Sequence, residues 1–438
     1  MKLQSILKKY GETAPRYTSY PPRPYWGQAP LLKDWIETLK IFSQHSSVDL
    51  YIHIPFCESL CAYCGCSRII TKDKNKSADY IKLVMQEWQL YKAQVPSLKM
   101  RSLHLGGGTP NFLTPLQLQE LLHFFSEDFT LDFKGSVEID PRTVEFSHLQ
   151  IFEKYSFNQI SLGVQDFDEV VQKEIHRLQS FELLQSLTHQ IRKIQKAEIN
   201  FDLIYGLPKQ TFLGFQNTLE KAVELSPESI VCFSFAYLPE VLKNQKIFKL
   251  ADIPSLDQKL DFLKQARSFL QQKGYYPIGL DHFAKEHSSL YQAWKNKTLT
   301  RNFMGYTDHK YGFLIGLGVT SISESSVGFV QNKKEITSYR EKISQGEFPF
   351  YAGHTLTDYE KTQAAIIQEF LCFSKASLNF SQLSQEQYAQ LKEMQKDGLL
   401  VMTVQGIEAT DLGKLFLRNI VQVFDQYRNS LKKQSAVI

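Results

Sequence analysis

The stretch PFCESLCAYCGCSR, residues 55–68, holds four of the six cysteines in a chain of 438 residues. Their spacing is C-x3-C-x2-C-x-C, through Cys57, Cys61, Cys64 and Cys66. Structural zinc sites usually combine two C-x2-C pairs separated by a dozen or more residues, and no second pair follows here. Three thiolates spaced C-x3-C-x2-C fit an iron–sulfur cluster better, and they leave one iron without a protein ligand. The stretch therefore predicts a metal centre with an open position for a small molecule.

The segments around this stretch predict alternating strands and helices. Six segments rich in Val, Ile, Leu and Phe are expected to be buried strands: 49–56, 102–108, 135–140, 159–165, 199–206 and 229–238. Helical periodicity fills the intervals, in 77–94, 114–129, 181–195 and 212–226. This alternation predicts βαβ units and a parallel sheet, either as a partial barrel or as an open doubly wound sheet. In both arrangements the C-terminal ends of the strands carry the chemistry.

Polar residues and glycines follow the expected strands at their C-terminal ends. They are Gly106, Gly107, Gly108, Thr109, Glu138, Asp140 and Gln165, with Asp202 inside the fifth strand. Glycines let a backbone approach a bound ligand closely, because they have no Cβ atom. The C-terminal edge of the sheet is therefore expected to carry both the cysteines and the residues that bind a ligand.

The C-terminal part of the chain has a different pattern. After a helix expected over 255–275, the alternation weakens, and two helices, a hairpin with its turn at Gln405-Gly406, and a last helix over 411–428 follow. This order resembles a winged-helix module, expected here to serve packing and to have no role in binding DNA.

Composition and charge exclude several function classes. The chain has 50 basic and 46 acidic residues, which argues against a nucleic-acid binder driven by bulk charge. Residues 1–22 have no apolar segment of the kind found in a secretory signal and no run of 18 apolar residues occurs, so we expect no membrane span and a cytoplasmic location. Thiols stay reduced there, and Cys232 and Cys372 are expected to be small buried residues.

The cysteine motif, with an aromatic Tyr63 before Cys64, resembles that of the radical S-adenosylmethionine (SAM) superfamily. Within it, YIHIPF before the motif and Cys66 after it resemble the oxygen-independent coproporphyrinogen III oxidases. Further matching stretches are PRYTSYPP (15–22), GVQDF (163–167), FDLIYGLPKQT (201–211), GLDHFA (279–284), RNFMGYT (301–307) and GIEATDLGKLFLRNI (406–420).

This resemblance implies an α/β fold, a partial (β/α)6 radical SAM barrel with a mostly helical, winged-helix-like C-terminal domain. The implied division is a substrate-covering arm at 1–45, the barrel with its extension at 46–350, and the C-terminal domain at 351–438. A [4Fe-4S] cluster and two SAM molecules are the implied cofactors. The implied partners are coproporphyrinogen III and an electron donor such as flavodoxin or ferredoxin, with no nucleic acid and no membrane, and a monomer is expected.

The implied reaction is an oxidative decarboxylation in heme biosynthesis. A reduced cluster cleaves SAM to methionine and a 5′-deoxyadenosyl radical, which takes a hydrogen atom from the β-carbon of a propionate. Loss of CO2 and one electron leaves a vinyl group. Two such events convert coproporphyrinogen III into protoporphyrinogen IX.

The resemblance also implies roles for individual residues. Cys57, Cys61 and Cys64 are the implied cluster ligands, and Cys66 is not one but either a structural thiol near the site or a catalytic residue. One SAM is placed near Tyr51, Tyr63, Gly107, Glu138 and Ile322. The second SAM is placed near Gly108, Thr109, Gln165, Arg177, Asp202 and Ala236. Arg16, Lys209 and Arg301 are candidates for binding the four propionates, while Tyr17 and Tyr20 either pack on the tetrapyrrole or anchor the arm. His53, His104 and His282 are expected behind the site.

Two alternatives and three departures accompany this interpretation. A heme-chaperone-like paralogue typically lacks the final cysteine and the RNFxGYT stretch, both of which are present here. A non-catalytic zinc or iron–sulfur module that touches nucleic acid conflicts with the near-neutral charge. Tyr63, Phe235 and Phe313 differ from the residues common in relatives, which puts substrate contacts in question more than cofactor binding.

Overall fold

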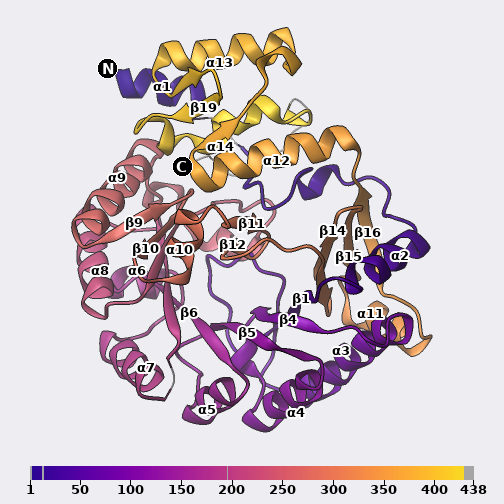
Figure 1. Cartoon of the computed structure of the whole chain (residues 1–438). Coiled ribbons are helices and arrows are strands. Elements are labelled where there is room, and N and C mark those ends of the chain that lie inside the picture. Colours follow the sequence, from indigo (N-terminus) through magenta and orange to yellow (C-terminus); the bar gives the residue numbers. More distant parts are fainter. Residues whose placement is uncertain (1, 12–13, 195, 429–438) are drawn as a thin grey trace.

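The computed structural model describes residues 2–11, 14–194 and 196–428 (Figure 1). Its centre is a sheet of twelve strands, of which six neighbouring parallel strands form the predicted barrel wall. They are β1 (Val48–Ile54), β4 (Met100–Gly107), β5 (Phe129–Ile139), β6 (Phe157–Gln165), β7 (Glu198–Tyr205) and β8 (Ser229–Ser234). All six lie where the sequence predicted them, so the partial (β/α)6 barrel is confirmed.

Helices cover the outer face of this wall (Figure 1). They are α3 (Asn75–Gln94), α4 (Pro115–Ser126), α5 (Phe146–Lys154), α7 (Phe181–Ile194), α8 (Phe212–Glu224) and α9 (Leu256–Gln272), whereas the short α6 (Glu169–Glu174) packs beside Ala62 of the 57–68 loop. Local sequence sets their ends: the Thr114 hydroxyl accepts from the Gln117 amide and Pro115 opens α4, which satisfies helix N–H groups that otherwise lack partners. Every residue of β1 is buried, as expected for a parallel strand covered on both faces.

Strands from the second half of the chain extend both edges of the barrel wall. Next to β1 lies β13 (Leu314–Leu317), which is parallel to it, followed by the antiparallel β14 (Ile322–Ser325), β15 (Gly328–Asn332) and β16 (Phe350–Thr355). Next to β8 lie β10 (His282–Lys285) and β9 (Tyr275–Ile278). Around them are α10 (Ser289–Lys295), α11 (Ile336–Ser344) and the hairpin of β11 (Thr300–Asn302) and β12 (Gly305–Thr307). The boundary expected between residues 350 and 351 falls inside β16.

The C-terminal module follows with α12 (Asp358–Phe373), α13 (Gln385–Asp397) and the small sheet of β17 (Lys375–Ser377), β18 (Leu400–Thr403) and β19 (Gly406–Ala409). Gly398, with a φ of +82°, ends α13 as predicted. The hairpin turn lies at residues 404–405, one position earlier than predicted.

The prediction of a single last helix over 411–428 is wrong. The segment forms two short 3-10 turns, Gly413–Leu415 and Gln422–Phe424, on either side of α14 (Leu417–Val421). All five residues of α14 are buried, and its Asn419 side chain donates to the Tyr10 carbonyl of the N-terminal segment. Contacts on every side therefore override the helical periodicity of the sequence.

The N-terminal arm crosses between the barrel and this module (Figure 1). It contains α1 (Lys2–Tyr10), a 3-10 turn at Arg23–Tyr25 and α2 (Leu32–Ser43). Buried hydrogen bonds fix it, from the Tyr17 hydroxyl to Asp425 at 2.9 Å and from the Tyr20 hydroxyl to the Phe424 carbonyl at 3.3 Å. Among the described residues, no helix is both long and apolar enough to cross a lipid bilayer.

Candidate active site

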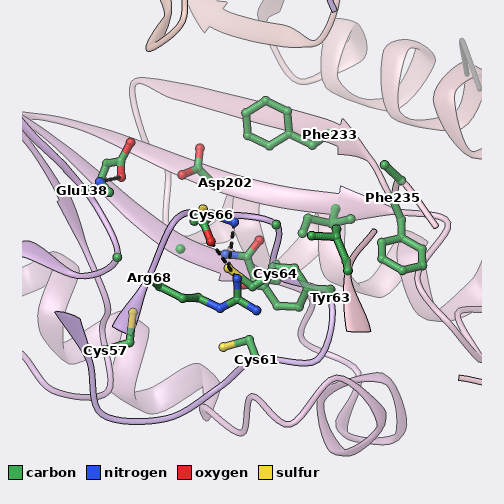
Figure 2. Close-up of a pocket in the computed structure, with 18 of the residues that line it drawn as sticks. Cys57, Cys61, Tyr63, Cys64, Cys66, Arg68, Glu138, Asp202, Phe233 and Phe235 are labelled. Carbon is green, nitrogen blue, oxygen red and sulfur yellow. Dashed lines mark hydrogen bonds between the residues drawn. The ribbon is translucent and has the colours of Figure 1, made fainter. Parts of the chain in front are cut away.

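A cavity of about 830 Å³ opens at the C-terminal ends of the parallel strands. Its lining includes residues of the N-terminal arm, the loop of residues 57–68 and the ends of β4 to β8. We call residues 57–68 the cysteine loop. Figure 2 shows Cys57, Cys61 and Cys64 of this loop together with Glu138 and Asp202 of the barrel wall. The cysteines and the ligand-binding edge predicted separately from the sequence therefore share one cavity.

The three cysteines provide a donor set suited to a cluster. Cys57 Sγ lies 3.3 Å from the Thr109 hydroxyl, and the Cys66 amide donates to Cys64 Sγ at 3.4 Å. Within the described residues, no three His, Cys, Asp or Glu side chains gather closely enough to hold a single metal ion. A cube of four irons and four sulfides joins thiolates that stand further apart than the ligands of one ion. Three cysteines on one loop of the cavity are the kind of donor set that such a cluster takes.

Two arginines surround Cys61 with positive charge. Its sulfur lies 3.6 Å from Arg177 Nη1 and 3.7 Å from Arg142 Nη2, and both guanidinium groups also bind Asp140, at 3.1 and 2.6 Å. Burial alone raises the pKa of Asp140, but Arg177 and Arg142 outweigh it and bring the pKa to about 2. One carboxylate between two guanidinium groups leaves net positive charge beside the anionic cluster position.

Asp140 and Arg142 were not among the predicted site residues. Asp140 was noted at a strand end without a role, and nothing in the sequence links Arg142 with Arg177, 35 positions further along the chain. The proximity of Asp140, Arg142 and Arg177 is a product of the fold. Arg177 Nε is buried and has no hydrogen-bond partner among the described residues, so this donor remains for a ligand.

The end of β4 forms a tight corner over Glu138. The Gly107 amide donates to Glu138 Oε2 at 3.2 Å, and His104 Nε2 lies 3.5 Å from Oε1. Burial raises the pKa of Glu138, but these neighbours outweigh it and hold the pKa below its usual value. Gly107 has a φ of +116°, and a Cβ atom there would lie 2.7 Å from the His53 ring. Packing against His53 therefore requires glycine at position 107, whether or not a ligand binds there.

Asp202 and Gln165 form the opposite wall. The Asp202 carboxylate accepts hydrogen bonds from Ser161 at 2.9 Å and Asn200 at 2.8 Å, and burial raises its pKa to about 6. Gln165, at the end of β6, has a φ of +67°, a left-handed conformation that costs a non-glycine residue energy. Local strain of this kind is common where a backbone presents a side chain to a ligand.

The structure brings most of the predicted SAM-binding residues to the cavity. Those that line it are Tyr63, Gly107, Gly108, Thr109, Glu138, Gln165, Arg177, Asp202 and Ala236. Tyr51 and Ile322 are not in the lining. The Tyr51 hydroxyl bonds to His53 Nδ1 at 2.9 Å and its ring stacks on His104, so Tyr51 supports the wall from behind. Ile322 packs against Gly316, the residue paired with Tyr51.

The candidate substrate residues separate into three kinds. Arg16 lines the cavity. Lys209 is on the surface, where it pairs with Glu174 at 2.6 Å. Arg301 donates to the Arg16 carbonyl at 3.4 Å, so it supports the arm from outside the cavity lining. Tyr20 anchors the arm through its bond to Phe424, and Tyr17, which does line the cavity, has its hydroxyl occupied by Asp425.

Fold and cavity together define a radical SAM protein, and comparison with known proteins supports this class. The family model described as Radical SAM superfamily matches residues 51–222, which include the cysteine loop. Oxygen-independent coproporphyrinogen III oxidase from Pseudomonas aeruginosa is 35% identical over 98% of this chain and 96% of its own length. The Helicobacter pylori (strain J99) oxidase is 37% identical, over 96% of each chain.

A solved structure supports the same assignment. Coproporphyrinogen III oxidase from Escherichia coli, described as a radical SAM enzyme, superposes with a TM-score of 0.90 at 34% identity. The match covers 97% of this chain and 98% of that one. This chain belongs to the oxygen-independent coproporphyrinogen III oxidase family. A [4Fe-4S] cluster and SAM are accordingly its cofactors.

Proposed function

We propose that this chain converts coproporphyrinogen III into protoporphyrinogen IX without oxygen, in heme biosynthesis. Two propionate side chains are decarboxylated to vinyl groups, which makes the chain an oxidoreductase. The observation that carries the proposal is the single cavity in which three cysteines, the glycine corner of β4 and Arg16 meet. The similarity over nearly the full length to oxygen-independent coproporphyrinogen III oxidases supports the same activity.

Cys57, Cys61 and Cys64 hold the cluster in this proposal, and its remaining iron binds SAM. A cluster held by these three thiolates would supply the one-electron reduction and radical chemistry that the reaction needs. Arg142 and Arg177 stabilise negative charge beside Cys61 through the contacts described above. Cys66 lines the same cavity but is left out of the ligand set.

The barrel wall binds the two SAM molecules. Tyr63, Gly107 and Glu138 contact the first, with Tyr51 and Ile322 supporting that wall. Gly108, Thr109, Gln165, Arg177, Asp202 and Ala236 contact the second. The unpartnered Nε of Arg177 offers one N–H donor to a carboxylate, since both Nη groups already bind Asp140. Asp202, already fixed by Ser161 and Asn200, accepts a ribose hydroxyl.

The N-terminal arm, residues 1–45, covers the substrate and excludes water. Arg16 extends into the cavity and forms no ion pair within the described part of the chain, so its charge is available to a propionate. Covering the site protects a carbon radical from side reactions with solvent. An electron donor such as flavodoxin or ferredoxin, a monomeric state and a cytoplasmic location complete the proposal.

Anaerobic turnover tests the function. Protein with a reconstituted cluster is incubated with SAM, a chemical reductant and coproporphyrinogen III, and protoporphyrinogen is followed by chromatography after oxidation. SAM-dependent product that Cys61→Ala abolishes supports the oxidase. SAM cleavage with no product, together with tight heme binding, would instead favour the heme-chaperone-like paralogue.

A further inference from the structure

Two neighbouring amide side chains bind three consecutive carbonyl groups of the cysteine loop. Asn244 and Gln245 lie in a 3-10 turn, Lys243–Ile247, that follows β8. Asn244 Nδ2 donates to the carbonyls of Ala62 at 2.8 Å and Cys64 at 3.0 Å. Gln245 Nε2 donates to the intervening carbonyl, that of Tyr63, at 3.1 Å. Both peptide groups that flank Cys64, one of the three candidate cluster cysteines, are therefore held from outside the loop.

Gln245 also connects the cysteine loop with the SAM-binding wall. Its second Nε2 hydrogen bonds the Ala236 carbonyl at 3.0 Å, and its Oε1 accepts from the Leu238 amide at 2.6 Å. The side chain is fully buried, and both donors and the acceptor are used. One residue thus fixes the distance between Tyr63 in the loop and Ala236 at the end of β8.

We propose that Asn244 and Gln245 form an amide clip that positions the cysteine loop, sets the reduction potential of the cluster and couples SAM cleavage to the substrate. The inference rests on the proposed function for its last part only. Gln245 borders the cavity, but its amide donors and acceptor are all used by backbone groups, so it acts through the loop as a positioning residue, as does Asn244.

The direction of the peptide dipoles gives the clip its effect. The Ala62, Tyr63 and Cys64 carbonyls accept hydrogen bonds from the amides, which keeps the negative ends of these dipoles directed at Asn244 and Gln245. The Cys66 amide, in the same turn, donates to Cys64 Sγ at 3.4 Å. Hydrogen bonds to cluster sulfurs and the dipoles around them tune the potential of iron–sulfur centres. Releasing the Tyr63 carbonyl lets its negative end turn inward, which disfavours the added electron.

The test compares Gln245→Met and Asn244→Ala with the wild type and with Gln271→Met. Gln271 is an exposed residue of α9 with the same side chain, so its variant controls for the substitution. Met has nearly the length of Gln and keeps the buried volume, but has no N–H donor. Three quantities are measured: iron and sulfide content, the midpoint potential by redox titration followed by EPR, and the EPR change when SAM is added.

We expect Gln245→Met to keep its iron but to show a lower midpoint potential and a weakened EPR response to SAM. The yield of product per SAM cleaved should fall about 10-fold or more, as is typical when support for a metal ligand is lost. Asn244→Ala should shift the potential in the same direction. An unchanged potential and SAM response in both variants would overturn the clip, as would equal changes in Gln271→Met.

Failure of the clip and failure of the proposed function are distinguishable. The potential, the EPR response and reductant-driven SAM cleavage do not require coproporphyrinogen III. If the wild type cleaves SAM but makes no protoporphyrinogen, the proposed function fails while the first two parts of the clip proposal are still tested. If Gln245→Met does not fold, Asn244→Ala decides the outcome, because Asn244 is only partly buried.

Discussion

At the scale of single residues, the site combines donors for a cluster with charges matched to anionic ligands. Burial raises the pKa of the metal-free Cys57 thiol to about 11, so cluster formation must displace a proton from it. Asp140 neutralises one of the two guanidinium groups beside Cys61, whereas Arg16 lines the cavity and has no ion pair among the described residues.

Cysteine substitutions should distinguish the three cluster ligands from Cys66, which lies beside them but is not a ligand. Cys57→Ala should lose most of its iron and acid-labile sulfide, because two thiolates do not retain the cube. Cys66→Ala, only two positions beyond Cys64, should retain both. Elemental analysis of anaerobically reconstituted proteins makes the comparison. Iron loss in Cys66→Ala as severe as that in Cys57→Ala would show that the ligand set is wrong.

Substitution of Arg16 should weaken substrate binding selectively. Arg16→Ala removes a charged hydrogen bond worth about 1.5–3 kcal/mol, which corresponds to a rise in KM for coproporphyrinogen III of about 10- to 100-fold. The KM for SAM should stay unchanged. Lys209→Ala is the matched control, since Lys209 binds Glu174 on the surface. Steady-state kinetics in which both variants behave alike would remove Arg16 from the substrate site.

At the scale of elements, the structure is held by polar contacts between segments far apart in sequence. His309, after β12, lies between Asp308 at 2.7 Å and Asp49 of β1 at 3.0 Å. The Tyr17 hydroxyl of the arm binds Asp425 beyond α14. The sequence does not reveal the contacts of His309 with Asp49 or of Tyr17 with Asp425. These residue types are common, and the separation of the two partners follows no helix or strand period. By contrast, the strands and their helices were predictable, since hydrophobic periodicity is a local signal.

The His309 contacts predict how stability depends on pH. Burial lowers the pKa of His309, but Asp308 and Asp49 outweigh it and raise the pKa from 6.5 to about 9. The protonated form is thus favoured by folding, so its stabilisation is complete below pH 6.5 and is lost as pH rises through 9. His309→Gln should be less stable than the wild type by about 1–3 kcal/mol at pH 6.5.

Urea unfolding at pH 6.5, 8 and 9.5 checks this expectation. The difference in unfolding free energy between wild type and His309→Gln should shrink as pH increases. Other groups that titrate in this range are common to both proteins and cancel in the difference. A gap that stays constant from pH 6.5 to 9.5 would mean that His309 is not charged in the folded protein.

Removing the Tyr17 hydroxyl should loosen the arm. Tyr17→Phe leaves the buried Asp425 without this donor, and we expect a loss of about 1–3 kcal/mol in unfolding free energy. Tyr388→Phe, at a residue that is 41% exposed, should be neutral. Thermal and urea denaturation of the three proteins provides the measurement. Equal stability of Tyr17→Phe and wild type would show that the hydrogen bond does not hold the arm.

At the scale of the whole molecule, the sequence predicted the barrel and the family, but not how the parts join. The last helix was overestimated because α14 is buried on all sides and its ends are set by contacts with the arm. The placement of β13 beside β1 joins segments more than 260 residues apart, and no local pattern encodes it. No local pattern encodes the contacts of Asp140 and Arg142 or those of the Asn244 and Gln245 amides either.

The central claim is that this cavity brings a propionate side chain of coproporphyrinogen III to the radical formed from SAM. The most direct measurement uses coproporphyrinogen III deuterated at the propionate β-carbons, under anaerobic turnover, with mass spectrometry of the 5′-deoxyadenosine produced. We predict one deuterium per 5′-deoxyadenosine formed in coupled turnover, with CO2 released in step. SAM cleavage that yields only unlabelled 5′-deoxyadenosine, with no CO2, would contradict the account.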